Sequence, residues 1–403
     1  MKKIWVVSEV YHPDEIGTAY YLTKLAEYFA QFYEVRVLCG KPKYNARGLI
    51  VPQNEVLNRV KIERCQDSNL NKNIFIFRIF NVFITSFLIL IKAIKKICKG
   101  DVVFVVTSPP VLPFVIKFAC AVRDAKCILR VDDVYPEVFF ATGIIKENGF
   151  LGKSLTLLNK ILYRKVDKII VIGRDMERLA RKKLGESENR IEIITNWADS
   201  DLIFDTPKLE NPLLFKLGLL NKFIVQCAGN MGRAQAIETM FKAAERLMDQ
   251  KDIHFLFIGA GQKRKWMDNE VNKKKLFNIT ILDQLSRQDQ PVFLNACDVS
   301  IASLLKGMTG AGVPSRMYNI MAAGKPIIAV CSQDSELALI VEEEGIGWVV
   351  HPDEPYKLAE VILEAKNNPE KLKEMGKRAR FVVETKYSFD RILQKYHNLF
   401  ESF

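Results

Sequence analysis

Short apolar runs alternate with longer amphipathic segments along the first half of the chain. Runs of this length, rich in β-branched residues and bounded by turn residues, are typical of buried strands. They predict strands at 4–10, 34–39, 102–107, 127–131, 168–172 and 191–195, and the segment from about 18 to 32 has the periodicity of a helix. Strands that alternate with helices in this way predict a parallel, doubly wound sheet.

The same pattern starts again in the second half. It predicts strands at 223–228, 254–258, 279–282, 299–302, 326–330 and 347–350, a helix at 237–250 and a helical tail at 369–403. Between the halves, the polar segment 199–221 is broken by Pro207 and Pro212, which indicates a linker. The sequence therefore predicts an α/β protein with two Rossmann-like doubly wound domains that face each other across a cleft. Ligands of such domains bind at the carboxyl ends of the strands.

Composition and charge narrow the possible functions. The 403 residues suit two or three domains, and 49% hydrophobic with 26% charged residues is an ordinary globular balance. The formal charge of +12 suggests an anionic partner, which could be nucleic acid, anionic lipid or a phosphate-bearing substrate. The alternative is that the charge only keeps the protein soluble. Eight scattered cysteines without a CxxC pair, and only four histidines, argue against zinc and disulfides. The first residues do not form a signal peptide, because their apolar run is short and reaches Glu9, so we expect a cytosolic protein.

Three glycine-containing turns follow predicted strands and precede predicted helices, at 14–19, 229–233 and 259–263. Each could present backbone N–H groups to an anion at a helix N-terminus, or could simply be a tight turn that favours glycine. None matches a dinucleotide-binding fingerprint or a P-loop. Taken singly, these turns do not decide between the two interpretations.

The segment 306–326 is more informative than the three turns. Its glycine-rich loop leads into Pro314 and then a predicted helix from about 316 to 323. Ser315, Arg316 and Met317 would offer free N–H groups at the start of that helix, which is the arrangement of a diphosphate cradle. The alternative is an ordinary N-cap serine on a core helix.

Three motifs resemble those of glycosyltransferase family 4. They are Ala228-Gly229-Asn230-Met231-Gly232, Val313-Pro314-Ser315-Arg316-Met317-Tyr318 with Met321-Ala322-Ala323-Gly324-Lys325-Pro326, and Asp133-Val134-Tyr135-Pro136-Glu137. The resemblance covers nearly the whole chain and is greatest to bacterial transferases of O-antigen and capsule assembly, such as L-fucosamine transferases. It implies the GT-B architecture, with an acceptor-binding domain at 1–205, a nucleotide-sugar-binding domain at 206–385 and a C-terminal helix at 386–403 that crosses back to the first domain.

The resemblance also implies how the donor is held. In that family a basic residue after the first glycine turn of the C-terminal domain faces the donor diphosphate. Arg233 matches by position and Lys263 is a second candidate, although Arg233 could instead be a solvated residue at the start of a helix. A fixed cation and helix N-termini can stabilise a departing nucleoside diphosphate, so we expect neither a metal nor a cofactor. The expected donor-binding residues are Gly17, Asn230, Gly232, Lys263, Ser315, Arg316, Met317, Asn319 and Glu336.

Two departures from the family concern the donor sugar. Many members carry two glutamates eight positions apart around this helix, where this chain has Ala311 and Asn319. Asn319 can still hydrogen-bond a ribose, but Ala311 cannot contact a sugar hydroxyl. We therefore expect an unusual sugar, such as the N-acetylated deoxyamino sugar L-FucNAc, on a UDP-linked donor. Glu336 could supply a carboxylate from the next loop, or could be a first-turn acid that interacts with the helix dipole.

The acceptor side departs from the family as well. Many members have a histidine where Asp132 stands, and none of the four histidines falls there. Asp132, Asp133 or Glu137 must then fill that role, because all three follow the predicted strand at 127–131. We name Asp132, Glu137 and Arg233 as the catalytic candidates. The family retains the anomeric configuration, and a front-face reaction would need these carboxylates to position rather than attack.

A very apolar segment at 74–99 contains no acidic residue, and its uncharged core at 79–91 is shorter than the ~20 residues that a membrane span needs. Its polar residues recur at helical spacing and predict one cationic stripe, made of Arg78, Asn81, Thr85, Lys92, Lys95 and Lys99. Such a helix suits an anionic membrane surface or a lipid tail, or is an unusually apolar core helix. A second basic segment at 153–168 could share the same face. We expect a peripheral protein at the inner face of the plasma membrane.

The sequence thus predicts a retaining, metal-independent glycosyltransferase with a hexosyl or acetamidodeoxyhexosyl donor. The acceptor implied by the resemblance is a polyprenyl-diphosphate-linked glycan of O-antigen or capsular polysaccharide synthesis. A nucleotide-sugar 2-epimerase can use the same architecture, but it would need acid and base groups on both faces of the sugar and no lipid acceptor. A basic nucleic-acid-binding protein would interleave exposed aromatics with lysines. Because the aromatics here cluster in an apolar segment, we expect no nucleic acid partner.

Overall fold

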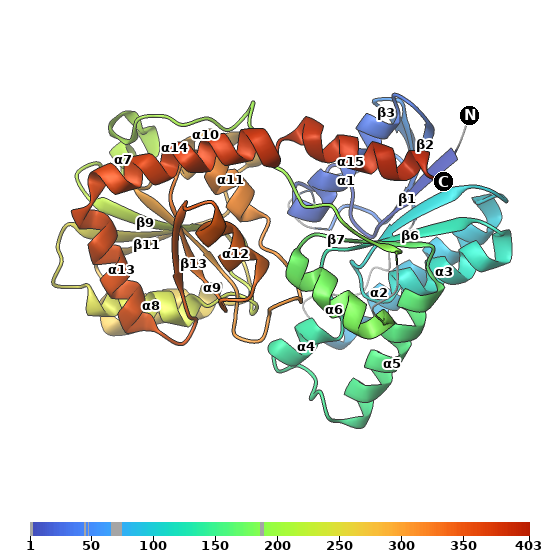
Figure 1. The fold of residues 1–403 in the computed structure, drawn as a ribbon, viewed down its shortest axis with the longest axis horizontal. Coiled ribbons are helices and arrows are strands. Elements are labelled where there is room, and N and C mark those ends of the chain that lie inside the picture. The colour runs from blue at the N-terminus through green and yellow to red at the C-terminus, as the bar shows by residue number, and fades with distance from the viewer. Residues whose placement is uncertain (1–2, 44–45, 47, 66–74, 186–188) are drawn as a thin grey trace. The chain divides into compact units, whose positions relative to one another are not determined.

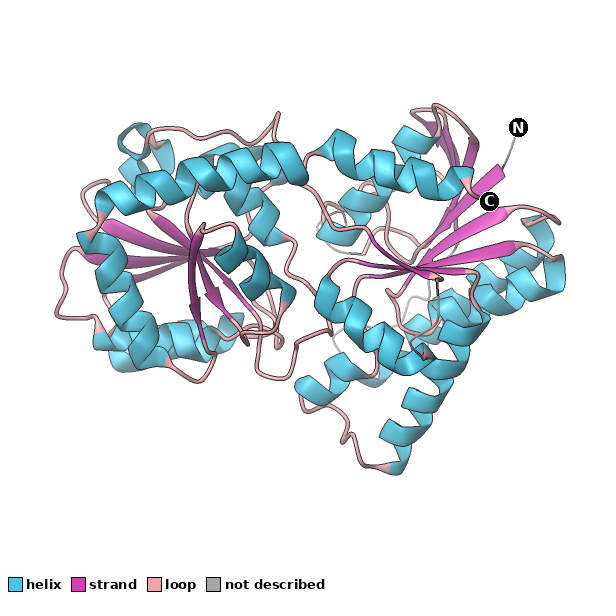
Figure 2. Cartoon of the chain, viewed as in Figure 1, coloured by secondary structure: helices cyan, strands magenta, loops and turns pink. Residues whose placement is uncertain are grey.

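The computed structural model describes residues 3–43, 46, 48–65, 75–185 and 189–403, with the backbone alone for 75–79. The chain divides into two compact units. The first holds residues 1–136, 146–194 and 393–403, and the second holds 137–145 and 195–392. Each unit is a largely parallel sheet with helices on both faces (Figures 1 and 2). The predicted fold class, two Rossmann-like doubly wound domains, is confirmed.

The first unit is built on an eight-stranded sheet. Its strands are β1 (Lys3–Val7), β2 (Glu34–Cys39), β3 (Asn54–Leu57), β4 (Val60–Arg64), β5 (Val102–Val106), β6 (Lys126–Val131), β7 (Lys168–Val171) and β8 (Ile191–Ile193). Its helices are α1 (Gly17–Phe29), α2 (Phe75–Lys96), α3 (Leu112–Arg123), α5 (Phe150–Lys165), α6 (Arg174–Leu184) and most of α15 (Phe389–Glu401). The spatial order is β3-β4-β2-β1-β5-β6-β7-β8, and the strands are parallel except for the antiparallel pair β3 and β4.

The second unit has a six-stranded, fully parallel sheet in the order β11-β10-β9-β12-β13-β14. Its strands are β9 (Phe223–Ala228), β10 (Ile253–Ile258), β11 (Ile279–Leu282), β12 (Val299–Ser303), β13 (Ile327–Val330) and β14 (Gly347–Val350). Its helices are α4 (Glu137–Ala141), α7 (Pro212–Leu217), α8 (Ile237–Arg246), α9 (Arg264–Lys274), α10 (Gln290–Leu294), α11 (Arg316–Ala322), α12 (Glu336–Glu343), α13 (Pro355–Asn367) and α14 (Pro369–Lys386), with 3-10 turns at Lys208–Glu210 and Arg287–Asp289.

Every strand expected from the apolar runs is present, with ends that differ by a few residues at most. The hairpin of β3 and β4 was not predicted. Its two-residue turn is formed by Asn58 and Arg59, both with positive φ (47° and 66°), and Leu57 pairs directly with Val60. Hairpin turns of this kind usually contain glycine, which is the signal that sequence reasoning looks for.

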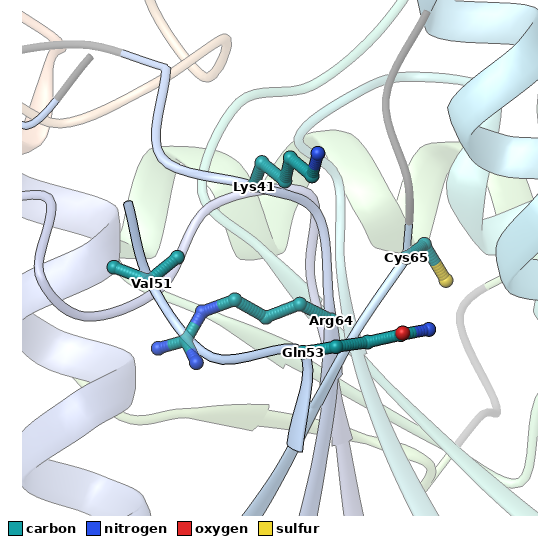
Figure 3. A pocket seen from close by; sticks show the side chains of 5 residues that line it. All are labelled: Lys41, Val51, Gln53, Arg64 and Cys65. Carbon is teal, nitrogen blue, oxygen red and sulfur yellow. The ribbon is translucent and has the colours of Figure 1, made fainter. Parts of the chain in front are cut away.

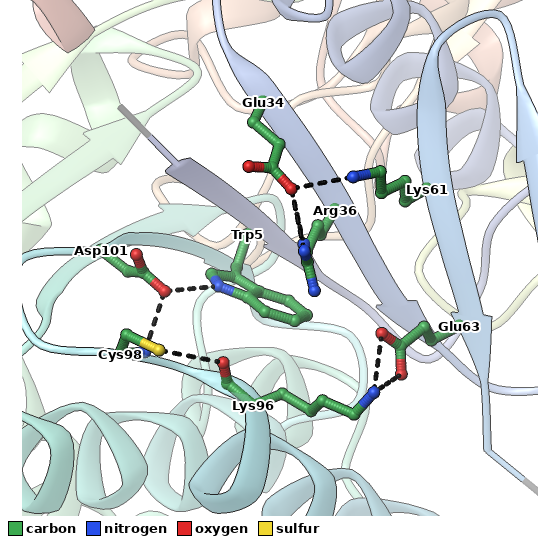
Figure 4. A network of polar contacts seen from close by, with 8 residues as sticks. All are labelled: Trp5, Glu34, Arg36, Lys61, Glu63, Lys96, Cys98 and Asp101. Atoms are coloured by element: carbon green, nitrogen blue, oxygen red, sulfur yellow. Dashed lines mark hydrogen bonds and ion pairs between the residues drawn. The ribbon is translucent and has the colours of Figure 1, made fainter. Parts of the chain in front are cut away.

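A polar network stabilises the first unit near the amino ends of its strands (Figure 4). The buried Trp5 indole donates to Asp101 at 2.8 Å, and the backbone N–H of Cys98 donates to the same carboxylate oxygen at 2.9 Å. Arg36 lies over the Trp5 ring and donates to Glu34. Because a buried indole N–H needs a hydrogen-bond partner, we interpret this network as structural. Ligands of doubly wound sheets bind at the opposite, carboxyl ends of the strands.

Candidate functional site

Two glycine turns of the second unit pack against each other at the carboxyl ends of β9 and β10. A Cβ on Gly261 would lie 2.4 Å from the carbonyl of Met231, and Gly259 is just as closely opposed to the turn after β9. Both glycines have a φ that side-chain-bearing residues rarely adopt, 150° at Gly259 and 159° at Gly261. Backbone hydrogen bonds then join the loops, since Lys263 N donates to Met231 O at 3.0 Å. The close approach of two backbones, more than the turns themselves, explains these glycines.

Arg316, the first residue of α11, holds the loop after β9. Its Nη2 donates to the carbonyl oxygen of Asn230 at 3.0 Å, and its Nη1 lies 3.7 Å from the Cys227 sulfur. A Cβ on Gly229 would stand only 3.2 Å from the guanidinium carbon, so that glycine makes room for the arginine. Sequence reasoning assigned Arg316 through its backbone N–H and missed this contact of the side chain.

The expected cradle of three free N–H groups is wrong for Met317. Its N–H donates to the carbonyl oxygen of Pro314 at 3.2 Å, because the chain closes a turn as it enters α11. Neither the N–H of Ser315 nor that of Arg316 has a backbone partner in the described chain. Ser315 occupies the N-cap position, yet its side chain caps no N–H group.

The two candidate cations of the donor side differ in how they are engaged. Arg233 lies exposed in the turn between β9 and α8 and makes no hydrogen bond or ion pair with described residues. Lys263 instead donates to Gln235 O at 3.0 Å and pairs with Glu238 at 2.5 Å. Because Glu238 balances the charge of Lys263, Arg233 is the cation that remains available to an anion.

Two further donor-side candidates are buried. Asn319 on α11 is 9% exposed, and its Oδ1 has no hydrogen-bond partner within the described residues. Glu336 is the first residue of α12 and is 3% exposed. The preceding residue, Ser335, is the N-cap, and its hydroxyl accepts a hydrogen bond from Ala338 N at 3.3 Å. Ala311 is fully buried. A buried amide oxygen without a partner is costly unless a ligand or a water satisfies it.

The second unit therefore gathers Asn230, Gly232, Arg233, Lys263 and Arg316 along two adjoining loops and the start of α11. Glu336 follows β13, the neighbour of β12 in the same sheet. Gly17 lies in the other unit, as the first residue of α1, and no side chain caps the N-terminus of that helix.

Asp132 and Asp133 follow β6 in the first unit, where both backbone N–H groups donate to the Thr107 hydroxyl at 3.2 Å. Asp132 accepts from Arg130 Nε at 2.8 Å. That arginine is 1% exposed and also donates to the Tyr396 hydroxyl at 2.7 Å. Asp132 is therefore a fixed carboxylate whose charge a buried arginine balances.

Asp133 is in a different situation. Its carboxyl group makes no hydrogen bond or ion pair within the described chain. Burial first, and the neighbouring charge of Asp132 second, raise the pKa of Asp133 to about 7. Glu137, the other acceptor-side candidate, is the first residue of α4 and belongs to the second unit.

A cavity of about 150 Å³ lies beyond the ends of β2 and β4, lined by Lys41, Val51, Gln53, Arg64 and Cys65 (Figure 3). The Arg64 guanidinium donates to the carbonyl oxygens of Pro52 and His12 and pairs with Glu55. These contacts tie the hairpin of β3 and β4 to the loop after β1. Because the charge of Arg64 is already balanced by Glu55, we interpret Arg64 as a structural residue.

Helix α2 turns its predicted polar stripe inward, which corrects the expectation that the stripe faces a membrane. Asn81 is 3% exposed, Thr85 is 1% exposed and accepts from Lys43 Nζ at 3.3 Å, and Lys92 donates to Arg64 O at 2.8 Å. The physical reason is that these side chains meet polar groups, the Lys43 ammonium group after β2 and the Arg64 carbonyl oxygen at the end of β4. Lys95 and Lys99 remain exposed, and Lys99 pairs with Asp124. The side chain of Arg78 lies outside the described residues.

The outward face of α2 is apolar instead. Its exposed side chains are Phe80, Phe83, Ile84, Phe87 and Ile91, which are 37–59% exposed. In the described part of the chain, no helix has both the length and the hydropathy needed to cross a bilayer. The same residues contain no group of three or more histidine, cysteine, aspartate or glutamate side chains placed to hold a metal ion.

Known proteins resemble the chain in sequence and in fold. The family described as "Glycosyl transferases group 1" matches residues 213–381, which include every candidate of the second unit except Glu137. The Pseudomonas aeruginosa protein named "Probable glycosyltransferase WbjE" is 30% identical over 397 residues, 98% of this chain and 97% of that one. Escherichia coli (strain K12) WcaI, named as a colanic acid biosynthesis glycosyl transferase, is 25% identical over 90% of this chain and 92% of its own. Anabaena Alr3699/HepE in complex with UDP and glucose has the same fold, with a TM-score of 0.77, 14% identity and full coverage of both chains.

Proposed function

Since the chain belongs to the glycosyl transferases group 1 family, we propose that it moves a sugar with retention from a nucleotide diphosphate donor to a polyprenyl-diphosphate-linked glycan. The observation that supports the donor side is the pair of interlocked glycine loops, with Arg316 bound to the loop after β9 and Arg233 without a partner among the described residues. Backbone and guanidinium donors at the carboxyl ends of parallel strands suit a diphosphate. The finer assignment to family 4 is part of this proposal.

Arg233 is the residue that we propose to stabilise the leaving nucleoside diphosphate. Negative charge grows on the diphosphate as the glycosidic bond breaks, and a cation held in place acts most strongly there. Lys263 has a lesser role, because its ammonium group is already paired with Glu238. With Arg233 in this role the reaction needs no metal ion.

We propose UDP as the nucleotide and an acetamidodeoxyhexose, such as L-FucNAc, as the sugar. The UDP complex of HepE, which shares the fold, supports the nucleotide. The Oδ1 of Asn319, which has no partner among the described residues, suits a ribose hydroxyl. The alanine at 311 leaves the sugar without a contact that a longer residue would make. Glu336, Ser315 and the loop residues Asn230 and Gly232 complete the donor site that we propose in the second unit.

We propose that Asp132 and Glu137 each have a role on the acceptor side. Asp132 stands at the carboxyl end of β6, where its charge is fixed by Arg130, and Glu137 begins the next helix. The name of WcaI, a colanic acid glycosyl transferase, supports a role in polysaccharide synthesis, and we propose O-antigen or capsular polysaccharide. We propose that the growing glycan carries a lipid, which would bring the enzyme to a membrane.

We propose that α2 adsorbs to the inner face of the plasma membrane through its apolar outward face, together with its neighbours α3 and α5. The three helices pack in the order α2, α3, α5 on one side of the first unit (Figure 1). Exposed apolar side chains continue from α2 onto the other two helices, at Phe118, Val122, Phe150, Leu151, Leu157, Leu158 and Ile161. None of the three helices contains an acidic residue, whereas together they carry Lys95, Lys153, Lys160, Arg164 and other basic residues.

A surface of this kind is unfavourable in water. Large contiguous apolar patches on a protein mark contacts with a partner or a membrane. Apolar residues flanked by lysine and arginine, without carboxylates to repel anionic headgroups, suit the boundary of a bilayer. We therefore propose an anionic lipid surface as the partner of these helices.

The test of the function is a panel of UDP-, GDP- and dTDP-sugars, incubated with extracted polyprenyl-diphosphate glycans and read by mass spectrometry. We expect a mass increase of one acetamidodeoxyhexose with a UDP-linked donor. A new epimer of the donor, with no change in the glycan, would instead indicate a 2-epimerase and contradict the proposal. Retention is then read from the anomeric coupling of the product by NMR.

A further inference from the structure

The cavity beyond the ends of β2 and β4 lies within the first unit, at the carboxyl edge of its sheet. Doubly wound domains bind their ligands at this edge. Two cations, Lys41 and Arg64, are among the described residues that line the cavity, and none of those residues is acidic. Cavities close to its volume of about 150 Å³ hold a molecule the size of benzene. A phosphate group, which has fewer heavy atoms, therefore fits.

Arg64, at the end of β4, has one donor more than the fold uses. Its Nη1 donates to the carbonyl oxygen of Pro52 at 3.0 Å, while its Nη2 donates to that of His12 at 2.9 Å and pairs with Glu55. Its Nε has no hydrogen-bond partner among the described residues, although Arg64 is only 2% exposed. A buried N–H group of this kind is costly unless a ligand or a water accepts its hydrogen bond. The terminal nitrogens are structural, and they hold the Nε in place.

The other polar groups of the cavity are also suited to an anion. Lys41 follows β2, is exposed, and makes no hydrogen bond or ion pair with a described residue. The backbone of Gln53 accepts from Arg64 N at 2.8 Å, which holds the segment before β3 at the cavity and leaves the side-chain amide available as a donor. In Figure 3 the Arg64 side chain extends between those of Lys41 and Gln53. Burial raises the pKa of the Cys65 thiol to about 11, so this lining residue is neutral and does not repel an anion.

We propose that this cavity binds a phosphate group, and that the group belongs to the diphosphate of the lipid-linked acceptor. The assignment to the acceptor rests on the proposed transferase function. An ammonium group and a guanidinium N–H bind phosphate oxygens through short, charge-assisted hydrogen bonds. Free inorganic phosphate or diphosphate has the same chemistry, and the two sources differ in whether the cavity changes the use of a lipid-linked glycan.

Helix α2 connects the cavity with the surface that we propose to meet the membrane. Lys92 of α2 donates to Arg64 O at 2.8 Å, and Lys96 pairs with Glu63 at 3.3 Å. The inward face of the helix thus contacts the same end of β4 that lines the cavity, whereas its outward face is apolar. The charged diphosphate of a polyprenyl lipid stays at the boundary of the bilayer, because charge is excluded from the hydrocarbon. A phosphate site beside an adsorbed helix would meet it there.

Binding of inorganic diphosphate tests the cavity directly. Titration calorimetry is carried out with UDP in excess, so that the proposed donor site is already occupied. We expect Lys41→Gln to weaken diphosphate binding roughly 10-fold, since it removes one charge-assisted hydrogen bond. Gln53→Leu, which removes a neutral donor, should weaken it roughly 3-fold. The control is Lys182→Gln, which removes an exposed lysine from α6 of the same unit and should bind as wild type does.

The source of the phosphate is read from transfer. Wild type and Lys41→Gln are each given the polyprenyl-diphosphate glycan and the same glycan without its lipid and diphosphate. We expect the preference for the lipid-linked glycan, measured as the ratio of the two kcat/KM values, to fall roughly 10-fold in Lys41→Gln. Equal melting temperatures of the two proteins would show that the fold is unchanged, as expected for an exposed side chain without a described partner.

The outcomes that contradict the proposal differ from one another. If wild type does not bind diphosphate in the presence of UDP, or if Lys41→Gln binds it equally well, the cavity is not a phosphate site. If Lys41→Gln loses diphosphate affinity but keeps the preference for the lipid-linked glycan, the cavity takes free phosphate and the assignment to the acceptor is wrong. An absence of transfer by wild type with every donor and acceptor would overturn the proposed function, while the calorimetric titration, which needs no turnover, would still decide whether the cavity binds phosphate.

Discussion

Gly259 lies so close to Gly229 that a Cβ built on it would stand 2.0 Å from the Gly229 carbonyl oxygen. The turns after β9 and β10 are thereby locked to each other at the place where we propose that the donor diphosphate binds. Glycine is needed at 259 for two separate reasons, its φ of 150° and the absence of any space for a side chain. The two reasons can be separated by a matched substitution.

We expect Gly259→Ala to lower the free energy of unfolding by roughly 2–6 kcal/mol, because backbone strain and steric overlap each cost about 1–3 kcal/mol. The matched control is Gly218→Ala, which also has a positive φ (68°) but has open space around its Cβ. The control should lose only about 1–2 kcal/mol. Urea unfolding of both variants measures the difference. Equal losses would mean that the loops can separate without cost.

Arg233→Ala should reduce the rate of transfer by ~10²–10³ with little change in melting temperature. The reason is that Arg233 is exposed and unpaired in the described chain, so the fold does not depend on it, whereas the leaving diphosphate would. Lys273→Ala, at the carboxyl end of α9, removes the same charge from the same unit and is the control. Initial rates at saturating donor check the prediction. A rate near that of wild type would place Arg233 outside the site.

Transfer should continue in EDTA at the rate seen in untreated enzyme. In the proposed donor site, Arg233, Arg316 and backbone N–H groups stabilise the charge of the diphosphate. A divalent ion is then not needed for that purpose. The measurement is product formation after chelation, with and without added magnesium or manganese. An activity that appears only when a metal is restored would refute this view of the donor site.

The sequence predicted the strands and the loops that end them, because buried parallel strands are short apolar runs and their ends bear glycine. It did not predict the hairpin of β3 and β4, whose turn uses Asn58 and Arg59 in place of glycine. It also did not identify the contact of the Arg316 side chain with the loop after β9, since periodicity locates a helix but not what its first side chain reaches.

Periodicity also did not determine which face of α2 packs against the rest of the protein. The spacing of Asn81, Thr85 and Lys92 correctly placed them on one side of the helix, but hydropathy suggested that this side faces out. The structure turns it toward Lys43 and the end of β4, because those neighbours are polar. In the same way, adjacent Asp132 and Asp133 look equivalent in sequence and become distinct only when Arg130 pairs with one of them.

The last prediction concerns the surface of the first unit. Purified protein should bind vesicles that contain anionic phospholipid, and binding should weaken without vanishing as salt rises, because salt screens the lysines but not apolar burial. Phe83→Ser with Phe87→Ser, which removes two outward side chains that are 53% and 59% exposed, should reduce binding at every salt concentration.

Charge and apolar contributions can be separated with two further variants. Lys95→Gln with Lys99→Gln should weaken binding by about 1 kcal/mol per residue at low salt and much less at high salt. Lys92 is left unchanged, because it donates to Arg64 O within the fold. Phe277→Ser with Phe381→Ser removes two phenylalanines of the second unit that are each 64% exposed, and it should leave vesicle binding unchanged. If the phenylalanine pairs of the two units had equal effects, or if wild type ignored anionic vesicles at low salt, α2 would not be the membrane contact.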